Sequence, residues 1–415
     1  SPEYKNNKYE TKAEYRNRLV RDFTLSSQSI QREVGKKPRI MVWPYGQFNN
    51  TAVDVAREVG MSHHFTLGEK LINKVGDKYI GRLLIDTETG FSTIKHYLDG
   101  VSDEVKIPRV VHIKLDDIYN ADKKQQAKNL DVLIERIYRY GITTVYLQAY
   151  SDADGDGVAD ALYFPNSYLP LRDDIFSQIA WQLRTRAEVK VYAWMPILAF
   201  DFRNSVKDAE YVVDSNKNIE IIKSIYNDLS FHAKFDGILF HDNVSLGDFE
   251  SEPSRHHQRM VTSDDLIKVT EQLVDGLKPY FLFGTNSLRT ARNIYASVIT
   301  ELKAEELFAQ NLNTLTKHYD TTVIMAMPYT EREQDISEKE AKAWFETLIN
   351  NVKAQVPLDK VFFEFQTMNG HTQKPIPESE LISWIQLLQK HKIYSYGYYP
   401  DNFLKDQPSI QQMRP

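Results

Sequence analysis

From residue 109 onward, short apolar runs alternate with longer segments whose apolar residues recur at helical spacing. The runs predicted to be strands are Val110–Tyr119, Thr143–Tyr150, Val189–Leu198, Phe235–His241, Thr290–Ala296, Thr321–Pro328, Lys360–Gln366 and Tyr394–Tyr399. Such alternation predicts an α/β fold with a parallel sheet, and eight repeats predict a closed (β/α)8 barrel of the TIM type. The alternative is an open doubly wound sheet. It is disfavoured because no Gly-rich phosphate turn follows any predicted strand.

The first hundred residues carry a shorter pattern of the same kind. A polar segment with helical periodicity, opened by a Thr11–Glu14 capping box, precedes a strand at Arg39–Trp43, a helix at Thr51–Val59 and a strand near His64–Leu67. This fragment is too small for a full core of its own. We therefore predict a partial domain over 1–100, a linker over 101–109 and the barrel domain over 110–415.

Composition narrows the classes of function. The 415 residues carry a net charge of −6, so there is no basic surplus to neutralise nucleic-acid phosphates. No apolar run approaches the roughly 20 residues needed to span a bilayer. The chain has no cysteine, which excludes disulfides and thiol catalysis.

Polar and aromatic residues follow the predicted strand ends, which meet at one mouth in a parallel barrel. Carboxylates there can act as acid, base or nucleophile on a glycosidic bond, and flat aromatic faces can bind sugar rings, so this set predicts a glycosidase. The candidate substrate-binding residues are Asp116, Asp117, Tyr150, Tyr192, Trp194, Asp201, His241, Tyr329, Glu364, Gln366, Tyr398 and Asp401.

Three carboxylates are candidates for catalysis: Asp242, Asp236 and Glu331. Asp242 lies past the end of a predicted strand, where catalytic groups of such barrels are found, and is the candidate general acid. Asp236 or Glu331 would raise the pKa of that acid from nearby. An Asp that opens a buried strand is also often structural, which is the alternative for Asp236.

The acidic loop Asp152–Asp160 resembles the first half of a calcium-binding loop, with carboxylates at Asp152, Asp154 and Asp156. The twelfth position is Tyr163, where an EF-hand has a bidentate Glu. We therefore interpret it as an acidic loop that draws a cationic substrate, and we assign no metal ligands.

Several long segments closely resemble the PgaB/HmsF family of bacterial exopolysaccharide export, whose barrel is glycoside hydrolase family 153. They are residues 146–172, 179–201, 235–243, 290–296, 323–331 and 396–404. The resemblance implies a C-terminal barrel that binds and endo-hydrolyses partially deacetylated poly-β-1,6-N-acetyl-D-glucosamine without a cofactor. It also implies an N-terminal N-deacetylase domain that requires a divalent metal. The implied setting is the periplasm, with a lipoprotein anchor at the outer membrane in the full-length protein and an export porin as partner. We expect a monomer.

The chain departs from this family in two places. The deacetylase half-motif Trp43–Gly46 is present, but the Thr-Phe-Asp-Asp and His-x-x-x-His motifs of the metal site are not. We therefore expect that only the second half of the deacetylase domain is present and that its metal site is absent from this chain. Asn243 also stands where the family's His-Asp-Asp pattern has a second Asp.

The same residues are also compatible with a second function. The barrel would be a non-catalytic module that guides deacetylated polymer to the export porin. Its acids would pair with glucosamine ammonium groups, and its aromatic side chains would stack on sugar rings.

Overall fold

The computed structural model describes residues 2–67, 73–82, 85, 91, 94–95, 107–202, 216–241, 262–283, 287–301, 304–331 and 336–409. The chain divides into two compact units. The N-terminal unit comprises Ser1–Lys106, Lys223–Lys234 and Val274–Leu288, and the barrel unit comprises Ile107–Ile222, Phe235–Leu273 and Arg289–Pro415. The first boundary lies inside the predicted linker 101–109. The predicted barrel range 110–415 differs from the observed unit, because two of its segments group with the N-terminal unit.

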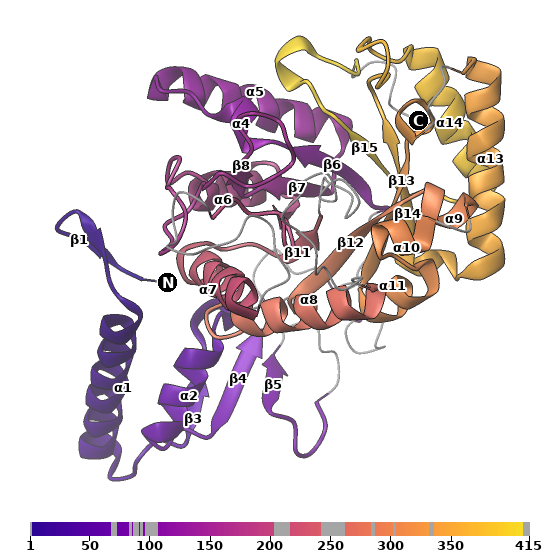
Figure 1. Ribbon diagram of the computed structural model, residues 1–415. Coiled ribbons are helices and arrows are strands. Elements are labelled where there is room, and N and C mark those ends of the chain that lie inside the picture. Colours follow the sequence, from indigo (N-terminus) through magenta and orange to yellow (C-terminus); the bar gives the residue numbers. More distant parts are fainter. Residues whose placement is uncertain are drawn as a thin grey trace. The chain divides into compact units, whose positions relative to one another are not determined.

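Eight parallel strands close into a barrel in the order β10-β11-β12-β13-β14-β15-β6-β7 (Figure 1). The strands are β6 (Arg109–Ile113), β7 (Thr144–Gln148), β10 (Lys190–Met195), β11 (Gly237–Phe240), β12 (Arg289–Tyr295), β13 (Thr321–Ala326), β14 (Val361–Gln366) and β15 (Tyr396–Tyr399). This confirms the predicted (β/α)8 architecture. The strands are buried on both faces and rich in Val, Ile and Phe, as parallel strands under helices are.

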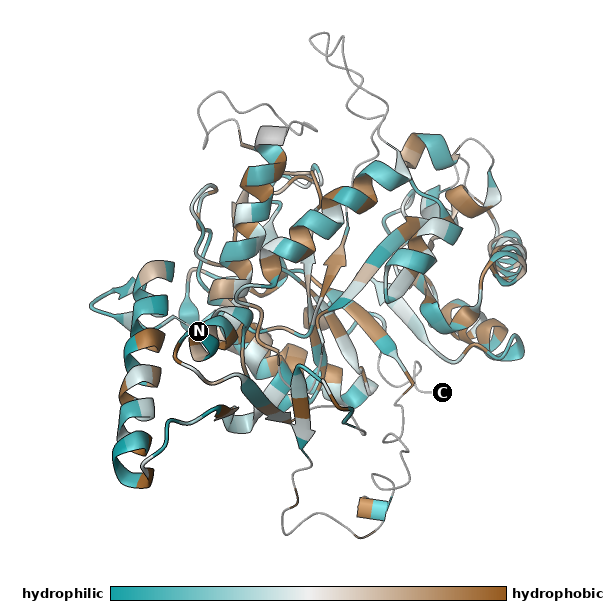
Figure 2. Ribbon diagram, turned by 90° about the horizontal axis from the view of Figure 1, so that it is seen from below, coloured by the Kyte–Doolittle hydropathy of each residue, from teal (hydrophilic) through white to brown (hydrophobic). Residues whose placement is uncertain are grey.

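Helices surround the barrel (Figure 1). They are α4 (Leu115–Ile118), α5 (Lys123–Tyr140), α6 (Phe176–Arg186), α7 (Asn216–His232), α8 (Ser263–Leu277), α9 (Ser297–Thr300), α10 (Ala304–Phe308), α11 (Leu312–His318), α12 (Pro328–Glu331), α13 (Glu338–Gln355) and α14 (Glu378–Lys390). Hydrophobic and hydrophilic residues lie side by side along these helices (Figure 2), so each buries one stripe. Short additions are the pair β8 (Tyr150–Ser151) and β9 (Ala161–Leu162) and the 3-10 turns η3 (Leu358–Lys360) and η4 (Phe403–Lys405).

Local sequence sets the limits of the long helices. Asp122 accepts a hydrogen bond from the backbone N–H of Lys124 at the start of α5, and Gly141 ends that helix at a φ of 61°. Ser337 and Glu340 form a capping box at the start of α13. These caps satisfy backbone groups that a helix end leaves without partners.

The N-terminal unit contains a three-stranded parallel sheet, β3-β4-β5. Its elements are the hairpin β1 (Tyr4–Lys5) and β2 (Lys8–Tyr9), α1 (Lys12–Val34), β3 (Ile40–Val42), η1 (Pro44–Gly46), α2 (Asn50–Glu58), β4 (His63–Leu67) and β5 (Tyr79–Arg82). The predicted Thr11–Glu14 capping box is confirmed at α1. The unit has its own apolar cluster, in which Tyr15 packs against Phe231 with ring centroids 5.7 Å apart.

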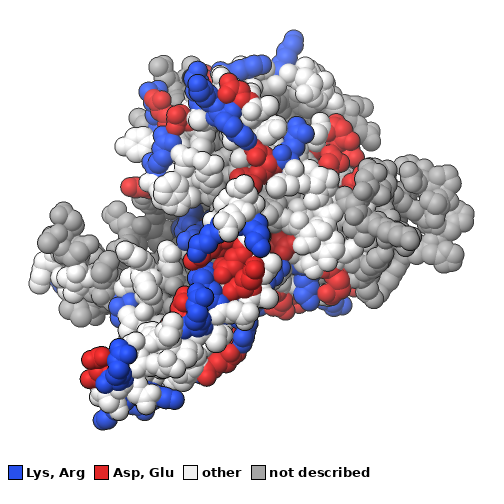
Figure 3. Space-filling model, turned by 90° about the vertical axis from the view of Figure 1, so that its left-hand side faces the viewer, with Lys and Arg blue, Asp and Glu red and all other residues white. Residues whose placement is uncertain are grey.

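Charged side chains of both signs are interspersed on the face shown in Figure 3. In the N-terminal unit, Arg16 of α1 pairs with Glu58, and both side chains are about half exposed. Exposed pairs of this kind contribute little to stability. Within the described residues, no helix is long and apolar enough to cross a membrane.

Candidate active site

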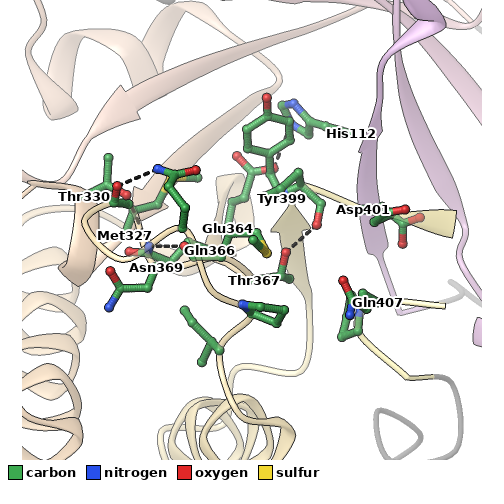
Figure 4. Close-up of a pocket in the computed structure, with 18 of the residues that line it drawn as sticks. His112, Met327, Thr330, Glu364, Gln366, Thr367, Asn369, Tyr399, Asp401 and Gln407 are labelled. Atoms are coloured by element: carbon green, nitrogen blue, oxygen red, sulfur yellow. Dashed lines mark hydrogen bonds and ion pairs between the residues drawn. The ribbon is translucent and has the colours of Figure 1, made fainter. Parts of the chain in front are cut away.

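A cavity of about 1360 Å³ opens at the carboxyl ends of the barrel strands (Figure 4). Gln366 and Tyr399 are the last residues of β14 and β15, and His241 directly follows β11. The inner part of the cavity is lined by His112, Lys114, Asp117, Trp194, His241, Tyr295, Met325, Glu364, Gln366 and Tyr399. The cavity therefore lies where active sites of this architecture are found.

A buried histidine and a buried glutamate form a close pair in the inner part of the cavity. Nε2 of His112 on β6 lies 2.8 Å from Oε1 of Glu364 on β14. The side chains are 2% and 1% exposed, respectively. The low dielectric of such a position makes each partner strongly dependent on the other. The contact thus brings one oxygen of Glu364 and one ring nitrogen of His112 together in the inner part of the cavity.

Aromatic rings form the wall around this pair. The Trp194 ring centroid lies 5.0 Å from that of His112, 5.4 Å from that of His241 and 6.0 Å from that of Tyr399. Burial raises the pKa of the Tyr399 phenol, which keeps it a neutral hydrogen-bonding group. The wall offers flat apolar faces beside a carboxylate, the combination that sugar rings require.

Charged groups of opposite sign lie at the mouth. Lys114 is two residues after His112, and its ammonium lies 5.8 Å from the centroid of the Tyr399 ring. Burial raises the pKa of Asp117 against the opposing effect of Lys114. The mouth therefore carries both a carboxylate and an ammonium group.

The outer part of the cavity runs between two loops, 367–379 and 400–408. Arg136 of α5 holds the second loop: its Nε donates to a carboxylate oxygen of Asp401 at 2.9 Å, and its Nη2 donates to the backbone oxygen of Pro408 at 2.7 Å. The two loops are joined where the Thr367 N–H donates to the backbone oxygen of Tyr399. Asp401 thus lines the cavity, as predicted, but its carboxylate is bound by Arg136.

Two predicted site residues lie at the opposite end of the barrel. Asp236 precedes β11, and its carboxylate accepts the Val191 N–H at 2.8 Å and contacts Arg184 at 3.1 Å. Tyr192 pairs in register with Gly237, the first residue of β11. Because the amino-terminal ends of the strands lie away from the cavity, the catalytic assignment of Asp236 and the binding assignment of Tyr192 were wrong. The structural alternative for Asp236 is the one observed.

The side chains of three further predicted residues form hydrogen bonds away from the cavity. The Tyr329 hydroxyl donates to Glu380, and the Tyr398 hydroxyl donates to Asp401. The Glu331 carboxylate accepts the backbone N–H groups of Ala296 and Ser297. None of the three lines the described cavity, so the roles predicted for them do not agree with the structure.

The remaining predicted residues divide into those that line the cavity and those beside it. Asp117, Trp194, His241, Glu364 and Gln366 line it, as predicted. Asp116 instead accepts hydrogen bonds from Ser151 and Tyr163, and Tyr150 is fully buried against Trp194. Asp201 lies beside the acidic loop, where its N–H donates to Ala159. Asp242 lies outside the described residues, and its role stays a prediction.

Sequence reasoning missed His112 and Lys114, and at the end of the eighth strand it chose Tyr398 instead of its neighbour Tyr399. The predicted strand Val110–Tyr119 was too long, because β6 ends at Ile113 and α4 begins at Leu115. The prediction therefore placed the carboxyl end of the strand near Asp116 and Asp117, several residues too late. Side-chain alternation along the strand could have indicated His112 and Lys114. They are polar residues two positions apart in an otherwise apolar run, so they lie on the same face.

One group of described residues has the spacing of a cation site. Asp152, Asp154 and Asp156 place carboxylate oxygens within 4.8 Å of one another. Backbone N–H groups of Gly155 and Gly157 donate to Asp152, so the loop stabilises its own carboxylate. Exposed acidic groups of this kind commonly hold no ion, and we assign no chemistry to it.

The sequence was then compared with known families. A family described as hypothetical glycosyl hydrolase family 13 (GHL13) matches residues 112–259 and 251–399. The chain belongs to this family. The matched range contains most of the cavity residues, from His112 to Tyr399.

Individual relatives agree with this assignment. Proteins of Escherichia coli K12 and O157:H7 named poly-beta-1,6-N-acetyl-D-glucosamine N-deacetylase are each 35% identical over 453 residues. These alignments cover 98% of this chain and 66% of each relative, so the chain spans just under two thirds of their length. The glycoside hydrolase domain of PgaB (BpsB) from Bordetella bronchiseptica is 31% identical with a TM-score of 0.63, covering 74% of this chain and 97% of that domain. The resemblance to the PgaB/HmsF family is confirmed.

Proposed function

We propose that the barrel binds and endo-hydrolyses partially deacetylated poly-β-1,6-N-acetyl-D-glucosamine. The observation that carries the proposal is the buried Glu364–His112 pair in a large aromatic-walled cavity, within the range matched to a glycosyl hydrolase family. The names of the E. coli relatives support the choice of polymer.

The size and chemistry of the cavity suit this substrate. Its volume of about 1360 Å³ exceeds the roughly 300–1,000 Å³ typical of small-ligand pockets, which favours several linked sugar rings. Tyr399, against which the buried Trp194 packs, supplies a face for ring stacking. The carboxylates of Glu364 and Asp117 suit the ammonium group of a deacetylated residue, while Gln366 suits hydroxyl and acetamido groups.

Asp242 remains the proposed general acid. It directly follows His241, whose side chain lines the cavity. In this role Asp242 donates a proton to the bridging oxygen as the bond from that oxygen to the anomeric carbon breaks, and water then supplies the hydroxyl of the new reducing end. Since Asp236 lies at the far end of the barrel, Glu364 and Asp117 are the carboxylates proposed to raise the pKa of the acid.

Product analysis by mass spectrometry tests the proposal. The wild-type chain and the Asp242→Asn and Glu364→Gln variants are incubated with partially deacetylated polymer. We expect shorter oligomers from the wild type and a loss of product of at least about a hundredfold from Asp242→Asn, as for removal of a general acid. Intact polymer from the wild type, with binding retained, would instead establish the guiding module. Cleavage by Asp242→Asn at the wild-type rate would refute the assignment of the acid.

The relatives' name supports a further proposal, that this chain is part of a protein that also removes acetyl groups with a divalent metal. The described residues of the N-terminal unit do not fit that metal. His63 and His64 are adjacent in β4 and point to opposite faces, and His64 stacks on Trp43 with centroids 5.8 Å apart. We therefore assign no deacetylation step to them.

We also propose, on the family resemblance alone, a periplasmic location at the outer membrane and an export porin as partner. Cell fractionation followed by detection of the protein in the outer-membrane fraction would test the location. Recovery in the cytoplasmic fraction would contradict it.

A further inference from the structure

Lys114 is an unexpected side chain in a cavity proposed to accept an amino sugar. It lies beyond the end of β6, lines the cavity and is partly buried. Its ammonium group lies 5.8 Å from the centroid of the Tyr399 ring. This places a cation next to one of the aromatic walls.

The surroundings keep this lysine charged. Burial disfavours the ammonium form, whereas the Asp117 carboxylate favours it, and the pKa of Lys114 is raised above its ordinary value. Lys114 is thus a cation at neutral pH. An ammonium has three donors and no acceptor, so it binds carbonyl and hydroxyl oxygens and repels other ammonium groups.

The cavity wall therefore has two electrostatically different positions. His112 and Lys114 point to the same face of the chain, about 7 Å apart along it. Glu364 lies beside His112 and suits a cationic sugar, whereas Lys114 disfavours one. A sugar residue whose nitrogen carries an acetyl group is neutral and presents a carbonyl oxygen, and both properties suit Lys114.

We propose that Lys114 is a specificity-determining residue that selects an N-acetylated sugar residue at its position in the cavity. The ammonium group donates a hydrogen bond to the acetamido carbonyl oxygen and excludes glucosamine from the same place. This combines an attractive contact with a repulsive one, as discrimination between related ligands usually requires. The inference rests on the proposed function, since it concerns the same polymer and the same cavity.

Equilibrium binding of defined β-1,6-linked oligosaccharides tests the inference without requiring catalysis. Fully deacetylated and half-acetylated oligomers of equal length are titrated against the wild type and against Lys114→Gln and Lys114→Met. Lys114→Arg, which keeps the charge, and Lys128→Gln, at an exposed position on α5, are the matched controls. Thermal unfolding of each variant is recorded first, and the binding comparison uses whichever neutral variant folds.

We expect the wild type to prefer the half-acetylated oligomer and both neutral variants to shift this preference toward the deacetylated one by at least about tenfold. The shift should shrink as salt rises, and both controls should keep the wild-type ratio. A neutral variant that keeps the wild-type ratio, or that loses affinity for both oligomers equally, overturns the role of Lys114 and leaves the proposed function in place. A wild type that binds neither oligomer overturns both.

Discussion

At the scale of single residues, the Glu364–His112 pair is the most consequential feature of the cavity. The two side chains are 2% and 1% exposed and lie 2.8 Å apart, so removal of either one leaves a polar group buried without its neighbour. A substitution in this pair should therefore change both the free energy of unfolding and the cavity that we propose binds substrate.

The dependence of Glu364 on His112 can be measured by a double-mutant cycle. We expect His112→Ala to lower the free energy of unfolding by about 3 kcal/mol, because it leaves a buried carboxylate without this partner. Adding Glu364→Gln should cost less in the His112→Ala background than in the wild type, since a neutral amide needs no counter-charge. Urea unfolding of the four proteins gives the coupling, with the exposed His371→Ala as the control. Strictly additive losses would contradict the pairing.

At the scale of elements, the Glu331 carboxylate connects two short helices near the candidate active site. It is the last residue of α12, and its carboxylate accepts the N–H groups of Ala296 and Ser297 at the start of α9. Burial raises the pKa of Glu331 to about 7, although both N–H groups act in the opposite direction. The residue joins two short helices instead of acting on substrate.

The raised pKa predicts a pH dependence of stability. Below about pH 4.5 the Glu331 carboxyl is protonated in both states. Between about 4.5 and 7 the unfolded chain loses this proton while the folded protein keeps it. The free energy of unfolding should therefore fall over this window, by about 3 kcal/mol at most.

Glu331→Gln should remove this fall, whereas Glu306→Gln, at an exposed position of α10, should keep it. Denaturant unfolding at pH 4.5 and pH 7.5 measures both variants against the wild type. If all three proteins show parallel profiles, Glu331 does not titrate in this window.

At the scale of the whole molecule, sequence order and compact units do not coincide. The apolar cluster of the N-terminal unit includes Phe231 and packs against Tyr280 and Phe283, which come from segments far along the chain. Tyr15 lies 6.1 Å from Tyr280, and Phe48 lies 5.8 Å from Phe283, measured between ring centroids. Cutting the chain at the linker would therefore divide a core.

A chain that begins at Ile107 tests this division. We expect it to fold, because the barrel unit begins at Ile107 and a barrel domain of a Bordetella relative, which matches 74% of this chain, was solved by itself. It should bind a hydrophobic dye more strongly than the full chain, since Phe231 and Tyr280 lose the cover of Tyr15. Replacing Phe231 by Ser in the shortened chain should reduce that binding. Equal dye binding by the long and short chains would show that these rings gain no exposure.

The sequence by itself determined the architecture of this protein, because repeated apolar runs and helical periodicity are local signals. The eight strands and the capping box at Thr11 follow from such signals, and the family follows from the resemblance of long segments. It also indicated Asp117, Trp194, His241, Glu364 and Gln366 as cavity residues, because each lies in the second half of a strand or shortly after it.

Only the tertiary structure decided which side chains share the cavity. Neighbouring residues in a strand point to opposite faces, so Tyr399 lines the cavity while Tyr398 turns toward the helices. Asp236 precedes its strand, as predicted, and only the contacts with Val191 and Arg184 decided that its role is structural. The Glu364–His112 pair joins residues 252 positions apart through the closure of the barrel, since β15 lies between β14 and β6. No local pattern encodes that contact.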